Sequence, residues 1–167
     1  MYLFTPLRKV EEPVQRCTSP QLKERILHRL VQLLYSKMNI VIDTSAVLAV
    51  LLNEDSKNRI LSLTKGQSLI APQSLNAEIG NALSAMFKRE RINLSLANKV
   101  ISQFELIPIR KTELQLEHSI DLCKKLNIYA YDAYMLSCLI NFKGTLLSLD
   151  QTLIQHAKNF GLNILEV

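Results

Sequence analysis

The stretch Asn39-Ile40-Val41-Ile42-Asp43-Thr44-Ser45 carries the most information about the fold of this chain. Its apolar, β-branched residues predict a buried strand over 39–42, and the Thr and Ser that follow Asp43 favour the start of a helix. The run Thr145-Leu146-Leu147-Ser148-Leu149 resembles it and leads to Asp150. Two apolar strands that each end at an acidic residue therefore bracket most of the chain.

Strand-like and helix-like segments alternate between these two runs. We expect strands at 39–42, 68–71, 106–109, 145–148 and 163–166, and helices at 44–53, 56–65, 73–91, 94–104, 112–127, 130–141 and 151–160. This alternation predicts an α/β fold, with a mostly parallel sheet of about five strands and helices on both faces. Such sheets bind their ligands at the carboxyl ends of the strands, where Asp43 and Asp150 are expected.

The first 37 residues differ in character from the rest. Prolines at 6, 13 and 20 favour an extended linker, and Ser19-Pro20 favours a helix start. An apolar stripe at helical spacing then follows, made of Leu22, Ile26, Leu27, Leu30, Val31, Leu33 and Leu34. We expect two parts: an N-terminal extension, 1–37, with a linker and an amphipathic helix, and a globular domain, 38–167.

Composition excludes several classes of protein. The 167 residues are 48% apolar without a run of 18, so we expect no membrane span or secretory leader and a cytoplasmic location. Three widely spaced cysteines disfavour a zinc site or a disulfide framework. The net charge of +5 favours a polyanionic partner, but residues 1–37 carry +4 of it, with seven basic and three acidic residues.

Four acidic residues are the candidates for chemistry: Asp43, Glu78, Asp132 and Asp150. Carboxylates that converge repel one another unless a divalent cation neutralises them, and oxygen ligands suit Mg²⁺ or Mn²⁺. Each acid also has an ordinary structural explanation. Asp43 and Asp150 suit helix caps, Glu78 suits a solvated helix face, and Asp132 suits a first helical turn.

Four motifs in order resemble those of PIN-domain ribonucleases, and of VapC-type toxins in particular. They are Ile40-Val41-Ile42-Asp43-Thr44-Ser45-Ala46, Pro72 with Glu78-Ile79-Gly80-Asn81-Ala82-Leu83, Tyr131-Asp132-Ala133-Tyr134, and Leu146-Leu147-Ser148-Leu149-Asp150. The fourth has Ser148 where that family commonly has Thr. The resemblance covers essentially residues 38–167, and Met38 stands where members of the family usually begin.

This resemblance implies a PIN-like, Rossmann-like three-layer α/β/α fold and a metal-dependent endoribonuclease. The four acids would chelate Mg²⁺ or Mn²⁺ and serve catalysis, with RNA as the substrate. Toxins of this group usually pair with a small antitoxin and form homodimers. If the helix in residues 1–37 packs against its own domain, it could occupy a groove that an antitoxin would otherwise use.

Other polar residues are candidates for supporting roles. Thr44, Ser45 and Ser148 are expected to hydrogen-bond the carboxylates or a phosphate. Lys88, Arg89 and Arg91 cluster near the end of the helix that carries Glu78, where they could contact RNA or simply favour the negative end of the helix dipole. Residues that would read bases are not evident, so the sequence predicts no base preference.

The main alternative is a non-catalytic PIN-fold module that binds RNA or protein, although all four acids are present. A haloacid-dehalogenase phosphatase would need Asp where Ser45 stands. The four glycines match neither a dinucleotide-binding motif nor a P-loop. A response-regulator receiver would need paired acids leading into the first-strand Asp and a late Lys in a fixed place, and the run before Asp43 does not fit that pattern.

Overall fold

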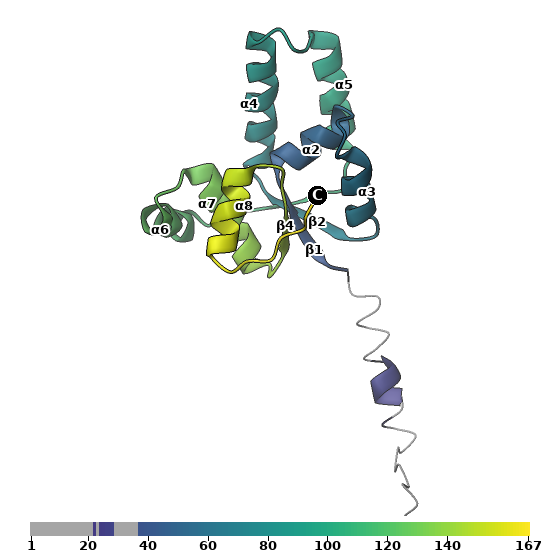
Figure 1. The fold of residues 1–167 in the computed structure, drawn as a ribbon, viewed down its shortest axis with the longest axis vertical. Helices are drawn as coiled ribbons and strands as arrows, with labels where there is room; N and C mark the ends of the chain where they lie inside the picture. The colour runs from purple at the N-terminus through teal and green to yellow at the C-terminus, as the bar shows by residue number, and fades with distance from the viewer. Residues whose placement is uncertain (1–21, 23, 29–36) are drawn as a thin grey trace, which may run out of the picture. The chain divides into compact units, whose positions relative to one another are not determined.

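The computed structural model describes residues 22, 24–28 and 37–167 (Figure 1). The chain divides into two compact units, residues 1–36 and residues 37–167. In the first unit, Leu22 and residues 24–28 are helical and exposed. The remaining positions predicted for the linker and the amphipathic helix lie outside the described residues, so the role of this extension stays a prediction.

Seven helices of the second unit carry the labels α2 to α8. They are α2 (Thr44–Leu51), α3 (Lys57–Thr64), α4 (Leu75–Lys88), α5 (Leu94–Glu105), α6 (Leu116–Leu126), α7 (Ala130–Asn141) and α8 (Gln151–Asn159). Within the described part of the chain, none of the helices is both long and apolar enough to cross a membrane.

The sheet of this unit is entirely parallel. Its strands are β1 (Asn39–Ile42), β2 (Ser68–Pro72), β3 (Arg110–Thr112) and β4 (Thr145–Leu147), in the order β3-β2-β1-β4. Val41 in β1 pairs with Ile70 in β2 and with Leu146 in β4. The first and last apolar runs of the sequence analysis therefore lie side by side, which places the residues after Ile42 and Leu147 at one edge.

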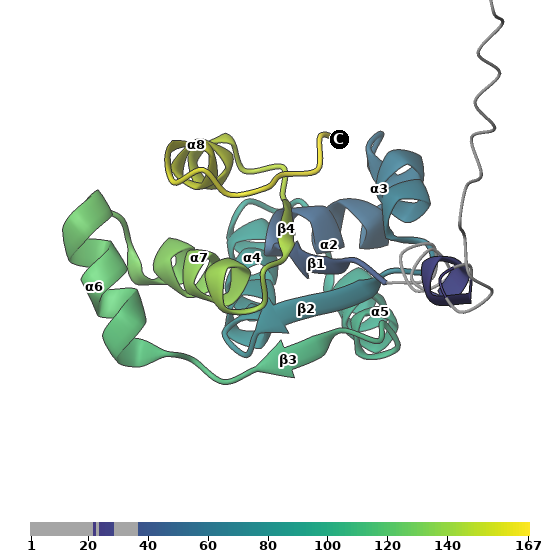
Figure 2. The same cartoon turned by 90° about the horizontal axis from the view of Figure 1, so that it is seen from below.

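Helices cover both faces of the sheet, as Figure 2 shows. Side chains alternate along a strand, so Ile40 and Ile42 join the core under α2, α3, α4 and α5, whereas Val41 joins the core under α6, α7 and α8. This is the predicted three-layer α/β/α architecture.

Two strand predictions were wrong. The expected fifth strand, 163–166, makes only a single bridge, Leu146 to Ile164. Its apolar side chains pack into both cores without a continuous ladder, so the sheet has four strands. The strand expected at 106–109 lies instead at Arg110–Thr112. As an edge strand, β3 pairs with Ile70, Ala71 and Pro72 on one side only, so it forms without apolar residues.

Candidate acidic site at the carboxyl edge of the sheet

Asp43 is built into the end of β1. Its backbone N–H donates to Leu147 O at 3.0 Å, which ties β1 to β4 just beyond their last ladder pair. Its carboxylate caps α2, because Oδ2 accepts from Ser45 N at 3.2 Å. The same oxygen accepts from the hydroxyls of Ser45 and Ser148. The side chain is only 7% exposed, so these neutral donors compensate for the water that it loses.

Ser45 and Ser148 join the two strand ends through their hydroxyl groups. Ser148 Oγ is buried and donates to Asp43 Oδ2 at 2.9 Å, and it accepts from Asp150 N at 3.0 Å. Ser45 Oγ lies 3.3 Å from Ser148 Oγ and accepts from Leu149 N at 2.9 Å. The turn after β4 is therefore held against the start of α2 by two serines that lie about a hundred residues apart in the chain.

Glu78 reaches the same edge from the first turn of α4. Thr44 Oγ1 donates to Glu78 Oε2 at 3.0 Å, and Ser74 Oγ donates to Oε1 at 2.9 Å. Burial raises the pKa of Glu78, the two hydroxyl bonds oppose that change, and the charges of Asp43 and Asp132 add to it. Sequence analysis did not single out Ser74, whose only signal is its position one helical turn before Glu78.

Asp132 and Asp150 complete the acidic edge from α7 and α8. Burial raises the pKa of Asp132, and the negative charges of Asp150 and Asp43 raise it further. Asp150 caps α8, because its Oδ1 accepts from Thr152 N at 2.7 Å and from Leu153 N at 3.3 Å. Capping and membership of the acidic edge are therefore compatible for both Asp43 and Asp150.

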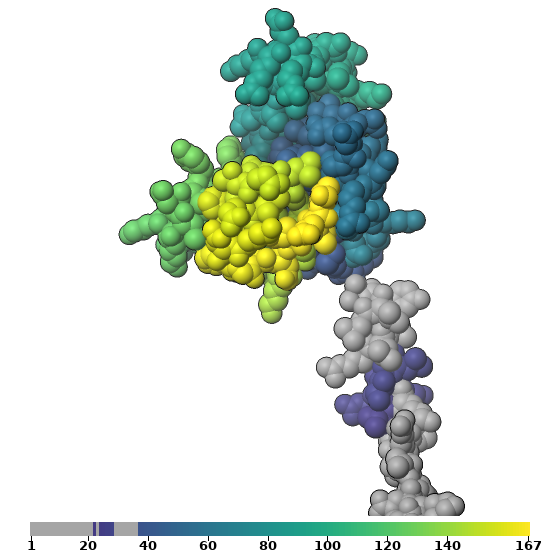
Figure 3. Space-filling model, in the orientation of Figure 1, coloured from purple at the N-terminus to yellow at the C-terminus, as the bar shows by residue number. Residues whose placement is uncertain are grey.

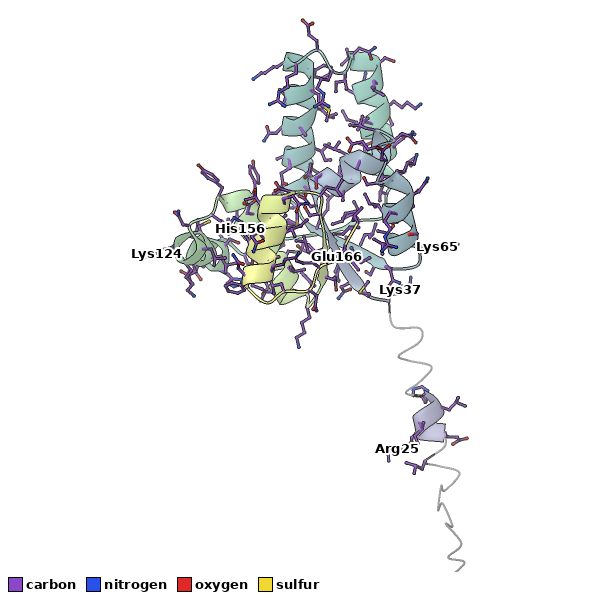
Figure 4. The ribbon with its side chains drawn as sticks, viewed as in Figure 1. Arg25, Lys37, Lys65, Lys124, His156 and Glu166 are labelled. Carbon is purple, nitrogen blue, oxygen red and sulfur yellow. The ribbon has the colours of Figure 1, made fainter. Side chains whose placement is uncertain are left out.

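His156 is a neighbour of this edge that sequence analysis missed. It lies on α8 (Figure 4) and is half-buried, and its positive charge lowers the pKa of Asp132. The only signal in the sequence is its spacing of six residues after Asp150 on one helix. That spacing has no meaning until the packing of α8 against α7 is known.

The four carboxylates at this edge repel one another electrostatically. Glu78 feels the charges of Asp43 and Asp132, and Asp132 feels those of Asp43 and Asp150. Among the residues that the structure describes, no three His, Cys, Asp or Glu side chains lie close enough to hold one metal ion. The chemistry of the donors still fits a hard divalent cation, because carboxylate oxygens that repel one another are stabilised by such a charge.

The predicted RNA-contacting cations lie apart from the acids. Lys88 ends α4, Arg89 caps it and Arg91 follows, and all three are exposed. Lys88 is ten residues beyond Glu78 on a continuous helix, or about 15 Å along its axis. Figure 1 shows this end of α4 pointing away from the sheet, so these cations do not join the acidic edge.

Comparison with known proteins supports the assignment of the fold. No curated protein matches the chain. The crystal structure of PAE2754 from Pyrobaculum aerophilum is similar, with a TM-score of 0.60 and 17% sequence identity, over 77% of this chain and 91% of that one. At that identity the similarity concerns the fold alone. The model of the PIN domain family matches residues 40–159, a range that includes all four acids. The chain therefore belongs to the PIN domain family, whose fold is of the nuclease type.

Proposed function

We propose that this protein is a metal-dependent endoribonuclease that hydrolyses RNA phosphodiester bonds at its acidic edge. One observation carries the proposal: four carboxylates from four separate elements act on one another at the carboxyl edge of the sheet in a PIN-family chain. Bringing four negatively charged groups together in the folded state costs free energy. Binding of a cation and a phosphate group at this edge would explain why the chain keeps them together.

In this proposal, Asp43, Glu78, Asp132 and Asp150 would hold Mg²⁺ or Mn²⁺, either directly or through bound water. When bound, the ion would lower the pKa of a water molecule and stabilise charge on the leaving oxygen. Asp43 and Asp150 each use one carboxylate oxygen, Oδ2 and Oδ1 respectively, for the hydrogen bonds given above. Their second oxygens remain available as ligands.

Glu78 is the residue best suited to proton transfer. Burial raises its pKa, and a carboxylate with a raised pKa accepts a proton more readily than an ordinary one, while a cation bound directly to it would oppose that change. The hydroxyls of Thr44 and Ser74 each hold one of its oxygens, which orients the carboxyl group. Ser45 and Ser148 orient Asp43 in the same way.

We further propose the partners that the resemblance to VapC-type toxins implies. The protein would be the toxin of a toxin–antitoxin pair, bound by a small antitoxin, and it would act as a homodimer in the cytoplasm. Lys88, Arg89 and Arg91 would contact only RNA that extends well beyond the cleaved bond.

The test is cleavage of a mixed RNA pool in Mn²⁺, in EDTA, and by Asp43→Asn. We expect the parent to cleave RNA in Mn²⁺ and not in EDTA. Asp43→Asn should lower the cleavage rate at least about a hundredfold, since even residues that only orient metal ligands contribute about 10- to 100-fold to metal affinity or activity. Asp121→Asn is the matched control, because Asp121 is an exposed acid on α6. Equal cleavage by the two variants would refute the proposal, and RNA binding without cleavage would favour a non-catalytic module.

A further inference from the structure

Three tyrosines gather at the start of α7, around Asp132. Tyr129 is 87% exposed and Tyr131 is 44% exposed. The rings of Tyr131 and Tyr134 meet edge to face, with centroids 6.1 Å apart and planes at 84°. Single exposed aromatic residues are common on protein surfaces. Three aromatic residues within six positions, beside an acid of the candidate site, give this stretch an aromatic surface, in which Tyr134 is half-buried.

Backbone geometry fixes this surface next to the acidic edge. Asn127 ends α6 in a left-handed conformation, with φ of 53°. Tyr129 is then the N-cap of α7, and its carbonyl accepts from Ala133 N at 3.1 Å. An N-cap residue and the third residue of its helix lie close together, as in the capping box. Tyr129 is therefore a neighbour of Asp132.

Neither core of the unit includes these three rings. Two lysines precede them closely in the chain. Lys124 and Lys125 are exposed in the last turn of α6, just before the turn that leads to Tyr129. Figure 3 shows side chains of the green segment, which holds α6 and α7, projecting beyond the rest of this face.

Tyr134 also lines a hollow of about 470 Å³ beside the edge strand β3. Arg110 lines the same hollow, and its guanidinium carbon lies 4.7 Å from the centre of the Phe142 ring. A chain of nucleotides that left the tyrosines along this hollow would meet positive charge. Aromatic rings joined to cations are the surface that single-stranded nucleic acids use, with bases on the rings and phosphates on the cations.

We propose that Tyr129, Tyr131 and Tyr134 form a stacking platform that holds an unpaired base of the RNA substrate next to the cleaved phosphodiester. This inference rests on the proposed ribonuclease function and identifies residues that position the substrate. A base in a duplex is already stacked and paired, so it cannot use the platform. The ring faces accept any base, and purines, with the larger face, should bind more tightly.

The first experiment measures RNA binding by fluorescence anisotropy in full-length Asp43→Asn protein, which prevents cleavage. The probes are labelled decamers: oligoadenylate, the same strand paired with oligouridylate, and a chain of abasic ribose phosphates with equal charge. We expect tight binding of the oligoadenylate alone. Adding Tyr129→Leu and Tyr131→Leu should weaken the affinity for oligoadenylate by about 5- to 150-fold, the range for loss of one stacked base. The remaining affinity should equal that for the abasic chain.

Two controls separate stacking from a structural role. Phe87→Leu and Phe160→Leu remove exposed aromatic rings elsewhere and should leave the affinity unchanged. Tyr131→Phe keeps the ring without its hydroxyl and should bind like the parent. Equal loss of affinity for oligoadenylate and for the abasic chain in the double-leucine variant would overturn the proposal, since it would indicate damage to charge contacts or to the fold.

A spectroscopic signal reports the platform directly. The chain has no tryptophan and five tyrosines, so with Tyr2→Phe and Tyr35→Phe only the three platform rings emit. Oligoadenylate should quench their emission in proportion to the anisotropy signal. Bound RNA with unchanged emission would overturn the proposal.

The outcome of this inference is separable from that of the proposed function. If the double-leucine variant on a wild-type background cleaves and binds RNA normally while Asp43→Asn does not cleave, the platform is refuted and the nuclease stands. If the parent binds and is quenched by oligoadenylate but no RNA is ever cleaved, the platform stands and the nuclease fails. Impaired binding of a protein partner, with normal RNA binding, would also refute the platform.

Discussion

Glu78 and Asp132 illustrate how the neighbouring side chains at this edge act on its acidic groups. Neutral hydroxyls of Thr44 and Ser74 hold Glu78, and the positive charge of His156 acts on Asp132. Burial and the neighbouring carboxylates outweigh these contacts, so the pKa of each acid is raised from its ordinary value of 4.5 for Glu78 and 3.8 for Asp132. Both groups therefore destabilise the fold when they ionise.

We predict that Asp132→Asn gains stability relative to the parent as pH rises. Because the pKa of Asp132 is raised in the folded state, the folded protein binds more protons than the unfolded chain, and its stability falls with rising pH. This loss of stability begins as the pH rises past the ordinary pKa of 3.8, and it is complete once the pH is above the raised pKa of the folded protein. The asparagine variant lacks this proton equilibrium.

Urea unfolding in EDTA between pH 4 and pH 8 measures the effect. Ser102→Ala, an exposed and uncharged change on α5, should differ from the parent by a constant amount. A free-energy difference between Asp132→Asn and the parent that stays constant across this range would contradict the prediction. Added Mg²⁺ should stabilise the parent more than Asp132→Asn if the acid is a ligand.

Gly144, between α7 and β4, lies close against strand β1. A Cβ atom there would lie 2.8 Å from Val41 Cγ2 and 3.2 Å from the Asn39 carbonyl oxygen. We predict that Gly144→Ala lowers the free energy of unfolding by about 1–3 kcal/mol, the usual cost of overpacking. Val41 lies at the centre of the sheet and cannot move without disturbing both of its neighbouring strands.

Gly80→Ala is the matched control for Gly144→Ala, because it makes the same substitution at an open position. A Cβ atom at Gly80 would meet nothing within 4 Å, and Gly80 lies inside α4. Alanine should therefore stabilise that helix by up to about 1 kcal/mol. Chemical denaturation of both variants checks the pair, and loss of stability of similar size in each would show that the close approach at Gly144 is not the cause.

The molecule as a whole places its sheet, both of its cores and the acidic edge within residues 37–167. We predict that a chain starting at Met38 folds and cleaves RNA at a rate within about twofold of the full chain. Met38 itself must remain, because its carbonyl accepts from Ser68 N at 3.0 Å and its N–H donates to Gln67.

Thermal unfolding and the cleavage assay on both chains test this prediction. A chain from Met38 that fails to fold would show that residues 1–37 contribute to the core. Faster cleavage by the shorter chain would instead indicate that the extension obstructs the site. Adding the separate peptide 1–37 to the shorter chain provides the control, because an obstructing segment should restore the slower rate.

Local patterns in the chain were enough to predict much of this arrangement. Apolar runs ending at Asp43 and Asp150 indicated two strands of a mostly parallel sheet with both acids at its carboxyl edge, and the structure adds that these strands, β1 and β4, are direct neighbours. The PIN resemblance is confirmed by the family match, whereas VapC-type toxicity stays a proposal. These features were predictable because a buried strand needs apolar side chains and a parallel sheet exposes its carboxyl ends.

Other features depend on contacts between distant parts of the chain. The polar strand β3 forms because β2 has a free edge, and the C-terminal segment packs its apolar side chains into the cores but makes only one bridge to β4. Ser74 and His156 reach the acidic edge only after α4 and α8 have docked. A residue type and its spacing determine which local structure is stable. Which side chains share a buried, charged edge is settled by packing, since burial and distance set the strength of every electrostatic contact there.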